Sequence, residues 1–157
     1  MIRVFAVLAL LFAVWLPKEA GAAESGHDTH HGYHPNLVAV FAGFTGEVRR
    51  ERSLSLGVEY FRRFNESFSV GALLENANGD RDFWIAAIPF AWHLGHWKLY
   101  AAPGIEHEEG HGDHYMVRLG VEYAFEVGKY EIAPQVDVDI VEGDTVFVMG
   151  VTFGRGF

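Results

Sequence analysis

From residue 37 onward, apolar residues alternate with polar or small residues in segments of roughly ten positions each. A period of two places successive side chains on opposite faces of a β-strand, and no segment shows the 3.6-residue period of a helix. The sequence therefore predicts an all-β protein. The expected strands lie at residues 37–46, 53–63, 67–75, 83–93, 97–106, 115–126, 130–140 and 145–157.

The connections between these segments alternate in length. The stretches FNES, LGH and VGK are short, whereas EVRRER, NANGDRD and HEEGHGDH are longer and carry most of the charge of the loops; EGD before the last strand is a short exception. Short turns at one end and longer polar loops at the other are typical of an antiparallel up-and-down barrel in an outer membrane.

The two faces of each strand differ in polarity. In the segment 130–140, for example, Ile132, Val136 and Ile140 alternate with Glu131 and Asp137. A soluble barrel would turn the apolar face inward and a membrane barrel would turn it outward, so the period alone leaves both open. A soluble, lipocalin-like barrel is the alternative fold, but the Gly-x-Trp that it would carry near the first strand is absent.

The aromatic residues distinguish the two arrangements, because those with the apolar parity gather toward the strand ends. Aromatic girdles at two levels are typical of a lipid-facing surface. Near the short turns lie Tyr60, Phe68, Trp92, Trp97, Tyr123, Phe125, Tyr130, Phe153 and Phe157, and near the longer loops lie Phe44, Trp84, Tyr115 and Phe147. We therefore expect a transmembrane β-barrel.

The last segment, TVFVMGVTFGRGF, alternates up to the final Phe157. In a closed barrel this strand pairs with the first and leaves no open edge. The segment is similar to the C-terminal aromatic signature by which bacterial outer-membrane barrels are recognised for assembly, although Arg155 departs from the pattern. Over residues 37–157 the chain resembles the small eight-stranded outer-membrane barrels of the OmpA and OmpX type. The resemblance implies an eight-stranded antiparallel up-and-down transmembrane β-barrel in the cell outer membrane, with the assembly machinery as a partner through Phe157.

The N-terminal region predicts export. Arg3 precedes an apolar run at residues 4–16, and small residues in KEAGAAES follow, so residues 1–23 read as a signal peptide. The apolar run is shorter than the ~20 residues that a membrane-spanning helix needs. Residues 24–36 contain four His and read as a flexible tail, so the barrel comprises 37–157.

The composition of the chain limits the kinds of partner that it can bind. Without residues 1–23 the chain has 10 basic and 20 acidic residues, a net charge of −10 with His neutral, which argues against nucleic acid as a partner. There is no Cys, so neither a disulfide nor a lipid-anchored cysteine is available. Outer-membrane lipids are the expected surroundings, and we expect a monomer.

The inward parity predicts an acidic interior with Lys98 and Arg118 as partners of the acids. Eight strands enclose a space just wide enough for their own side chains, so the lumen is expected to be closed. The acids form either a structural polar network or a mouth that concentrates cations. The acidic residues nearest the longer loops are Glu75, Glu106, Asp137 and Asp139.

The stretch HEEGHGDH offers a candidate metal site in one loop. Imidazole and carboxylate together suit Zn²⁺, Ni²⁺ or Cu²⁺, and no other cofactor is expected. The candidate ligands are His107, His111, His114, Glu108 and Asp113. The His of the N-terminal tail would form a second, independent weak site.

The hypothesis that the protein is an enzyme depends on few residues. Some small outer-membrane barrels modify lipid A with a His, a Ser and an acid, and here Ser67 and Ser69 lie near His93, His96 and Glu66. No catalytic residue is assigned on this basis. The sequence predicts a small structural or surface-interaction barrel with weak divalent-metal binding at its extracellular mouth; the alternatives are a narrow transporter or ion conduit and a lipid-modifying enzyme.

Overall fold

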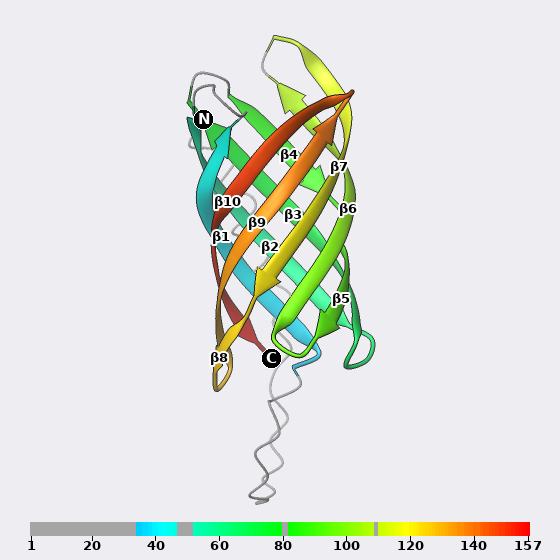
Figure 1. The fold of residues 1–157 in the computed structure, drawn as a ribbon, viewed down its shortest axis with the longest axis vertical. Coiled ribbons are helices and arrows are strands. Elements are labelled where there is room, and N and C mark those ends of the chain that lie inside the picture. Colours follow the sequence, from blue (N-terminus) through cyan, green and yellow to red (C-terminus); the bar gives the residue numbers. More distant parts are fainter. Residues whose placement is uncertain (1–33, 47–51, 80–81, 109) are drawn as a thin grey trace, which may run out of the picture.

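The chain forms a closed antiparallel β-barrel with strongly tilted strands (Figure 1). The computed structural model describes residues 34–46, 52–79, 82–108 and 110–157. In these ranges the strands are β1 (Asn36–Gly46), β2 (Arg52–Arg63), β3 (Phe68–Asn78), β4 (Phe83–Ala87), β5 (Phe90–Leu94), β6 (Trp97–Glu108), β7 (Gly112–Tyr123), β8 (Phe125–Val127), β9 (Tyr130–Val141) and β10 (Asp144–Gly156). Pairing of β10 with β1 closes the sheet.

Two interruptions divide single barrel strands into pieces. β4 and β5 both pair with β3 and β6, and between them Pro89 lacks a backbone N–H. Hydrogen bonds still cross this break, from Gly71 N to Pro89 O at 2.8 Å and from Ile88 N to Pro103 O at 3.0 Å. Likewise β7 and β8 both pair with β9. The barrel therefore has eight strand positions, and the prediction of an eight-stranded antiparallel barrel is confirmed.

The β6–β7 hairpin is longer than the sequence predicts. The stretch HEEGHGDH was expected to be a loop, but β6 continues to Glu108 and β7 begins at Gly112, with His107 paired to Asp113. This expectation was wrong because backbone pairing continues regardless of how polar the side chains are. The hairpin rises beyond the other strand ends (Figure 1).

The register fixes the tilt of the strands. If paired residues are followed from each strand to the next, one circuit of the barrel starts at Asn36 of β1 and returns to β1 at Gly46. The register is therefore displaced by 10 residues along β1. Such a displacement requires a strand tilt of about 40° to the barrel axis. The residues met on the way are Arg62, Val70, Phe90, Ala101, Leu119, Val138 and Phe147. All of them face outward.

The seam between first and last strands is bonded at its foot. Asn36 N donates to Phe157 O at 3.1 Å and Phe157 N donates to Asn36 O at 2.9 Å. The side chain of Asn36 accepts a hydrogen bond from the Tyr60 hydroxyl at 2.8 Å. The closing role predicted for the last strand is thus observed.

The outer surface carries the apolar side chains in an exposed band. Two levels of aromatic rings flank this band, and at the short-turn end the rings contact one another. The ring pairs and their centroid separations are Phe68–Trp92 at 6.4 Å, Trp97–Tyr123 at 4.9 Å, Tyr123–Phe125 at 5.0 Å and Tyr130–Phe153 at 6.1 Å. We call these residues the short-turn girdle. An exposed apolar band between aromatic girdles is the surface of a protein that spans a bilayer.

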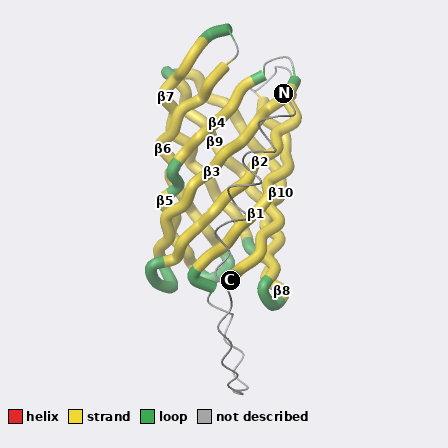
Figure 2. The backbone as a smooth tube through the Cα atoms, turned by 180° about the vertical axis from the view of Figure 1, so that it is seen from behind, coloured by secondary structure: helices red, strands yellow, loops and turns green. Residues whose placement is uncertain are grey.

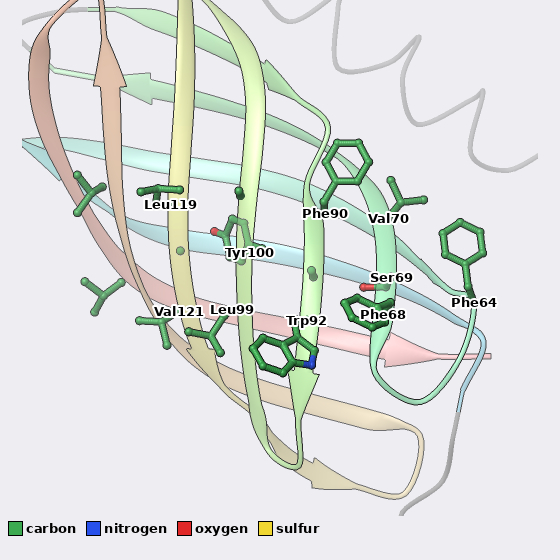
Figure 3. A pocket seen from close by; sticks show the side chains of 15 residues that line it. Phe64, Phe68, Ser69, Val70, Phe90, Trp92, Leu99, Tyr100, Leu119 and Val121 are labelled. Atoms are coloured by element: carbon green, nitrogen blue, oxygen red, sulfur yellow. The ribbon is translucent and has the colours of Figure 1, made fainter.

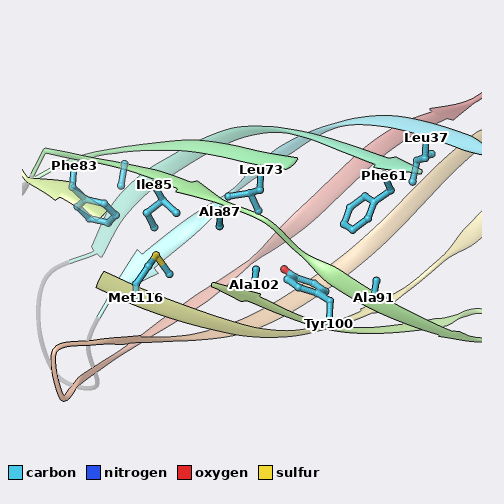
Figure 4. Packing of buried hydrophobic residues seen from close by; sticks show 11 residues of the cluster. Leu37, Phe61, Leu73, Phe83, Ile85, Ala87, Ala91, Tyr100, Ala102 and Met116 are labelled. Atoms are coloured by element: carbon cyan, nitrogen blue, oxygen red, sulfur yellow. The ribbon is translucent and has the colours of Figure 1, made fainter. Parts of the chain in front are cut away.

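The lumen is only partly polar, which differs from the prediction of a polar interior. On the wall formed by β4 and β5 the inward side chains other than His93 are apolar, and they extend into a cluster with neighbouring strands (Figure 4). The buried members are Leu37, Phe61, Leu73, Ala77, Phe83, Ile85, Ala87, Ala91, Tyr100, Ala102 and Met116. Charged and amide side chains instead project from β7 and β9.

The predicted signal peptide, residues 1–23, lies outside the described residues, as does most of the predicted His-rich tail, residues 24–36. Within the described ranges no helix is long and apolar enough to cross a bilayer. Figure 2 shows the same backbone from behind, with strands joined by loops and turns throughout the described part.

Candidate functional site

The centre of the lumen is bridged by Arg118, whose side chain is fully buried. Its Nε and Nη2 donate to Asp139 Oδ1 and Oδ2 at 2.7 and 2.8 Å, which is a bidentate pair. Its Nη1 donates to Glu75 Oε2 at 2.5 Å. Asp139 is on the neighbouring strand β9, whereas Glu75 is on β3, three strand positions away. Arg118 therefore ties opposite walls together with charge-assisted hydrogen bonds.

A second group lies toward the short turns, around Tyr100 of β6. The Tyr100 hydroxyl donates to Asp137 Oδ1 at 2.7 Å. Gln135 Nε2 donates to the same hydroxyl at 2.8 Å and to Asp137 Oδ2 at 2.7 Å. Asp137 is thus held by two neutral donors rather than by a direct contact with a cation.

The third group surrounds Lys98 near the short-turn end. Its Nζ lies 2.7 Å from Glu122 Oε2 and 4.0 Å from the centroid of the Phe61 ring, an ion pair with a cation–π contact. Lys98 also interacts electrostatically with Glu59 and Glu131. Three carboxyl groups therefore face one ammonium group, and Glu59 Oε2, which is buried, has no hydrogen-bond partner.

The structure thus separates the four acids predicted at the mouth. Glu75 and Asp139 share Arg118, and Asp137 joins the Tyr100 group. Glu106 is buried higher up, where β6 pairs it with His114 of β7. Lys98 and Arg118 lie inside the lumen, where the parity of the strands predicts them, but they serve different acids.

Ser69 and His93 are in contact inside the short-turn end. Ser69 Oγ lies 2.8 Å from His93 Nε2, while Arg63 Nη2 lies 3.2 Å from His93 Nδ1. A guanidinium only donates, so Nδ1 must be the acceptor and Nε2 must carry the proton. An Nε2–H that donates to Ser69 cannot remove the proton of that hydroxyl. In this arrangement His93 does not activate Ser69 as a nucleophile.

The predicted metal ligands form pairs at the tip of the β6–β7 hairpin. His107 Nδ1 lies 2.6 Å from Asp113 Oδ1, and His111 Nδ1 lies 3.6 Å from Glu108 Oε1. His114 instead approaches Glu142 of the β9–β10 turn, with Nδ1 3.1 Å from Oε2. Within the described ranges no three or more His, Asp or Glu side chains form a group that could hold a metal ion. Metal binding at these residues stays a prediction.

Sequence reasoning missed Tyr100, Gln135 and Phe61 as members of the lumen network. The parity of β6 and β9 signals that Tyr100 and Gln135 point inward, but nothing in the pattern pairs them with Asp137. Phe61 likewise has the inward parity of β2 and contacts Lys98 across the lumen.

Solved structures with this fold are membrane barrels. Ail of Yersinia pestis, in complex with the heparin analogue sucrose octasulfate, is similar with a TM-score of 0.57 at 11% identity, over 78% of this chain and 97% of Ail. The N-terminal β-barrel domain of Pseudomonas aeruginosa OprF gives 0.55 at 11% identity, over 80% of this chain and all of that domain (100%). A de novo designed transmembrane β-barrel gives 0.53 at 8% identity, over 78% of this chain and 98% of the design.

No protein-family model matches the chain, and no curated protein matches it. The similarities therefore concern the fold. Together with the exposed apolar band they define the class: a small eight-stranded transmembrane β-barrel of the outer-membrane type, which is the class and location that the sequence predicts. In this class the short turns face the periplasm and the longer connections face the cell exterior.

Proposed function

We propose that this protein is a closed outer-membrane barrel that acts as a structural and surface-interaction element through its extracellular rim. The observation that carries the proposal is the Arg118 bridge between Glu75 on β3 and Asp139 on β9. Beside its β3 end, the buried apolar side chain of Ile85 projects from β4, where it pairs with Glu75. A lumen packed in this way leaves the rim as the part that can meet other molecules.

The rim supports a surface role by its shape and chemistry. The β6–β7 hairpin carries Tyr115, which is 82% exposed, together with the exposed side chains of His107 and Asp113. Aromatic rings presented with polar neighbours are common anchors of protein interfaces. The paired imidazole and carboxylate groups of this hairpin are also the basis for weak divalent-cation binding, which belongs to the same proposal.

Conductance in planar bilayers tests the closed lumen. The purified wild-type barrel is expected to insert without stepwise ion currents in concentrated salt, where abundant charge carriers make even a narrow pore detectable. Regular current steps would refute the closed lumen and support a conduit. The Arg118→Gly variant is the matched comparison, since it removes only the side chain that crosses the lumen.

A hairpin exchange tests the surface role. Replacement of residues 107–114 by a short Gly-Ser turn removes the hairpin tip and leaves the membrane-embedded strands intact. The wild-type barrel and the exchange variant should both show a heat-dependent shift in gel mobility. Cells that carry the wild-type barrel should attach to host-cell or abiotic surfaces, and cells that carry the variant should not. Equal attachment by both would refute a role for this hairpin.

A further inference from the structure

A shallow groove of about 780 Å³ lies on the outer wall of the barrel (Figure 3). It crosses five neighbouring barrel strands, from β3 through β5, β6 and β7 to β9. One row of outward side chains along it is continuous in the register, since each member pairs with the next. This row consists of Val70, Phe90, Ala101, Leu119 and Val138.

A small side chain forms the floor of the groove, and aromatic rings line its short-turn end. Ala101 is a small side chain between the larger Phe90 and Leu119, with which it pairs on either side. At the short-turn end, Phe68 and Trp92 stack with their ring planes 11° apart. Figure 3 shows these rings standing beside the row of aliphatic side chains. The foot of the groove therefore belongs to the short-turn girdle.

The groove climbs through one leaflet of the bilayer. Neighbouring strands are about 4.8 Å apart, and at a tilt of about 40° the four steps from β3 to β9 raise the row by about 12 Å. Half of a ~30 Å hydrocarbon core is ~15 Å. The groove thus runs from the girdle at the periplasmic interface to near the middle of the membrane, which is the path of an acyl chain.

A cation lies at the foot of the same row. Arg62 of β2 pairs with Val70, faces outward and is exposed. A guanidinium binds phosphate through two parallel hydrogen bonds. A second copy that docks through the same face would have to bring an acid to Arg62, whereas none of the residues that line the groove is acidic. Charge therefore favours a phospholipid over a second barrel.

We propose that this groove binds a single phospholipid of the periplasmic leaflet, with one acyl chain along the row from Val70 to Val138 and its phosphate on Arg62. The inference does not depend on whether the lumen is closed or on what the extracellular rim contacts. The proposal adds one specific phospholipid site to the outer wall, where a transmembrane barrel is otherwise expected to contact lipids without specificity.

Lipid retention tests the proposal. Mature barrel is refolded in bilayers of phosphatidylethanolamine and phosphatidylglycerol, transferred to mild detergent, and examined by native mass spectrometry for bound phospholipid. The wild type should retain one phospholipid as a monomer. Ala101→Phe fills the groove and should abolish retention, whereas Ala42→Phe, an exposed outward alanine on β1 outside the groove, should retain lipid as the wild type does.

The arginine is tested in the same assay. Arg62→Gln should weaken retention about tenfold or more, because the variant loses the charge-assisted hydrogen bonds to the phosphate. Arg155→Gln changes an exposed outward arginine of β10 and should have no effect. Folding of each variant is checked by its heat-dependent gel mobility, and Leu119→Phe serves as a second groove-filling variant if Ala101→Phe does not fold.

Three outcomes would overturn the proposal. These are equal retention by Ala101→Phe and Ala42→Phe, no phospholipid on the wild type, and a dimer in place of a lipid-bound monomer. Retention that is lost in the groove variants but unchanged in Arg62→Gln would overturn the phosphate assignment.

Discussion

Tyr100 and Gly120 lie opposite each other on β6 and β7, and the phenol ring of Tyr100 fills the space that a side chain at position 120 would need. A Cβ at this position would also meet Asp137 Oδ1, the acceptor of the Tyr100 hydroxyl. The glycine is therefore what allows Tyr100 to lie flat across the wall and reach Asp137 on β9.

Gly120→Ala should destabilise the barrel by about 1–3 kcal/mol, as overpacking of a filled interior does. The measurement is urea-induced unfolding of the protein in lipid vesicles, followed by tryptophan fluorescence. Gly57→Ala is the matched control, because its Cβ would have a closest neighbour 3.2 Å away, at Leu74 O. Equal unfolding midpoints for the two variants would contradict the proposed role of Gly120.

Removal of the charge at Arg118 should be more costly. Arg118→Met leaves Glu75 and Asp139 buried without their cation, and we expect a loss of about 3–5 kcal/mol in the same unfolding assay. The triple variant Arg118→Met, Glu75→Gln, Asp139→Asn removes all three charges and should recover much of this loss. A single Arg118→Met variant as stable as wild type would show that the bridge does not hold the walls together.

The tautomer of His93 can be observed directly. Because Arg63 Nη2 faces Nδ1, the neutral ring should carry its proton on Nε2, which donates to Ser69. Long-range ¹H–¹⁵N correlation spectra of the folded barrel in detergent distinguish the two tautomers. A proton on Nδ1 would reverse the direction of the Ser69 hydrogen bond and make nucleophilic activation of Ser69 geometrically available.

Metal binding at the rim is tested by titration with Zn²⁺. The structure offers pairs of one imidazole and one carboxylate at this rim, so any binding should be weak and should require His107, His111 and His114 together. The triple variant with Ala at these positions should show no heat of binding in calorimetry. An unchanged titration curve in that variant would exclude the hairpin as the site, and a variant of His34 then tests the other end of the barrel.

The period of two predicted the strand positions well because one face of every strand meets lipid. Where both faces meet water, as at His107 and Asp113, the pattern carries no such signal and the paired hairpin reads as a loop. The break at Pro89 is likewise invisible to the parity, since the backbone groups beside the missing donor still pair: Gly71 N donates to Pro89 O, and Ile88 N donates to Pro103 O.

The sequence predicted which side chains point into the lumen, but not which of them contact one another. Parity turns Arg118, Glu75 and Asp139 inward, but which acid an arginine reaches depends on the displacement of 10 residues in the register. That displacement follows from the pairing of all strands at once. The apolar wall was not predicted because the inward side chains were identified by their charges, and alanines such as Ala87 and Ala91 carry none.

The uneven lumen has a consequence for assembly. The strand position made of β4 and β5 carries no charged side chain on its inner face, where Phe83, Ile85 and Ala91 lie with the neutral His93, and its outer face is apolar. Before the barrel is closed, this part of the sheet can lie against hydrocarbon on either side without burying a charge. β9 cannot, because Asp137 and Asp139 project from its inner face and need their partners on β6 and β7. The molecule thus has a side that tolerates an unfinished state in the membrane and a side whose inward carboxyl groups require the closed barrel.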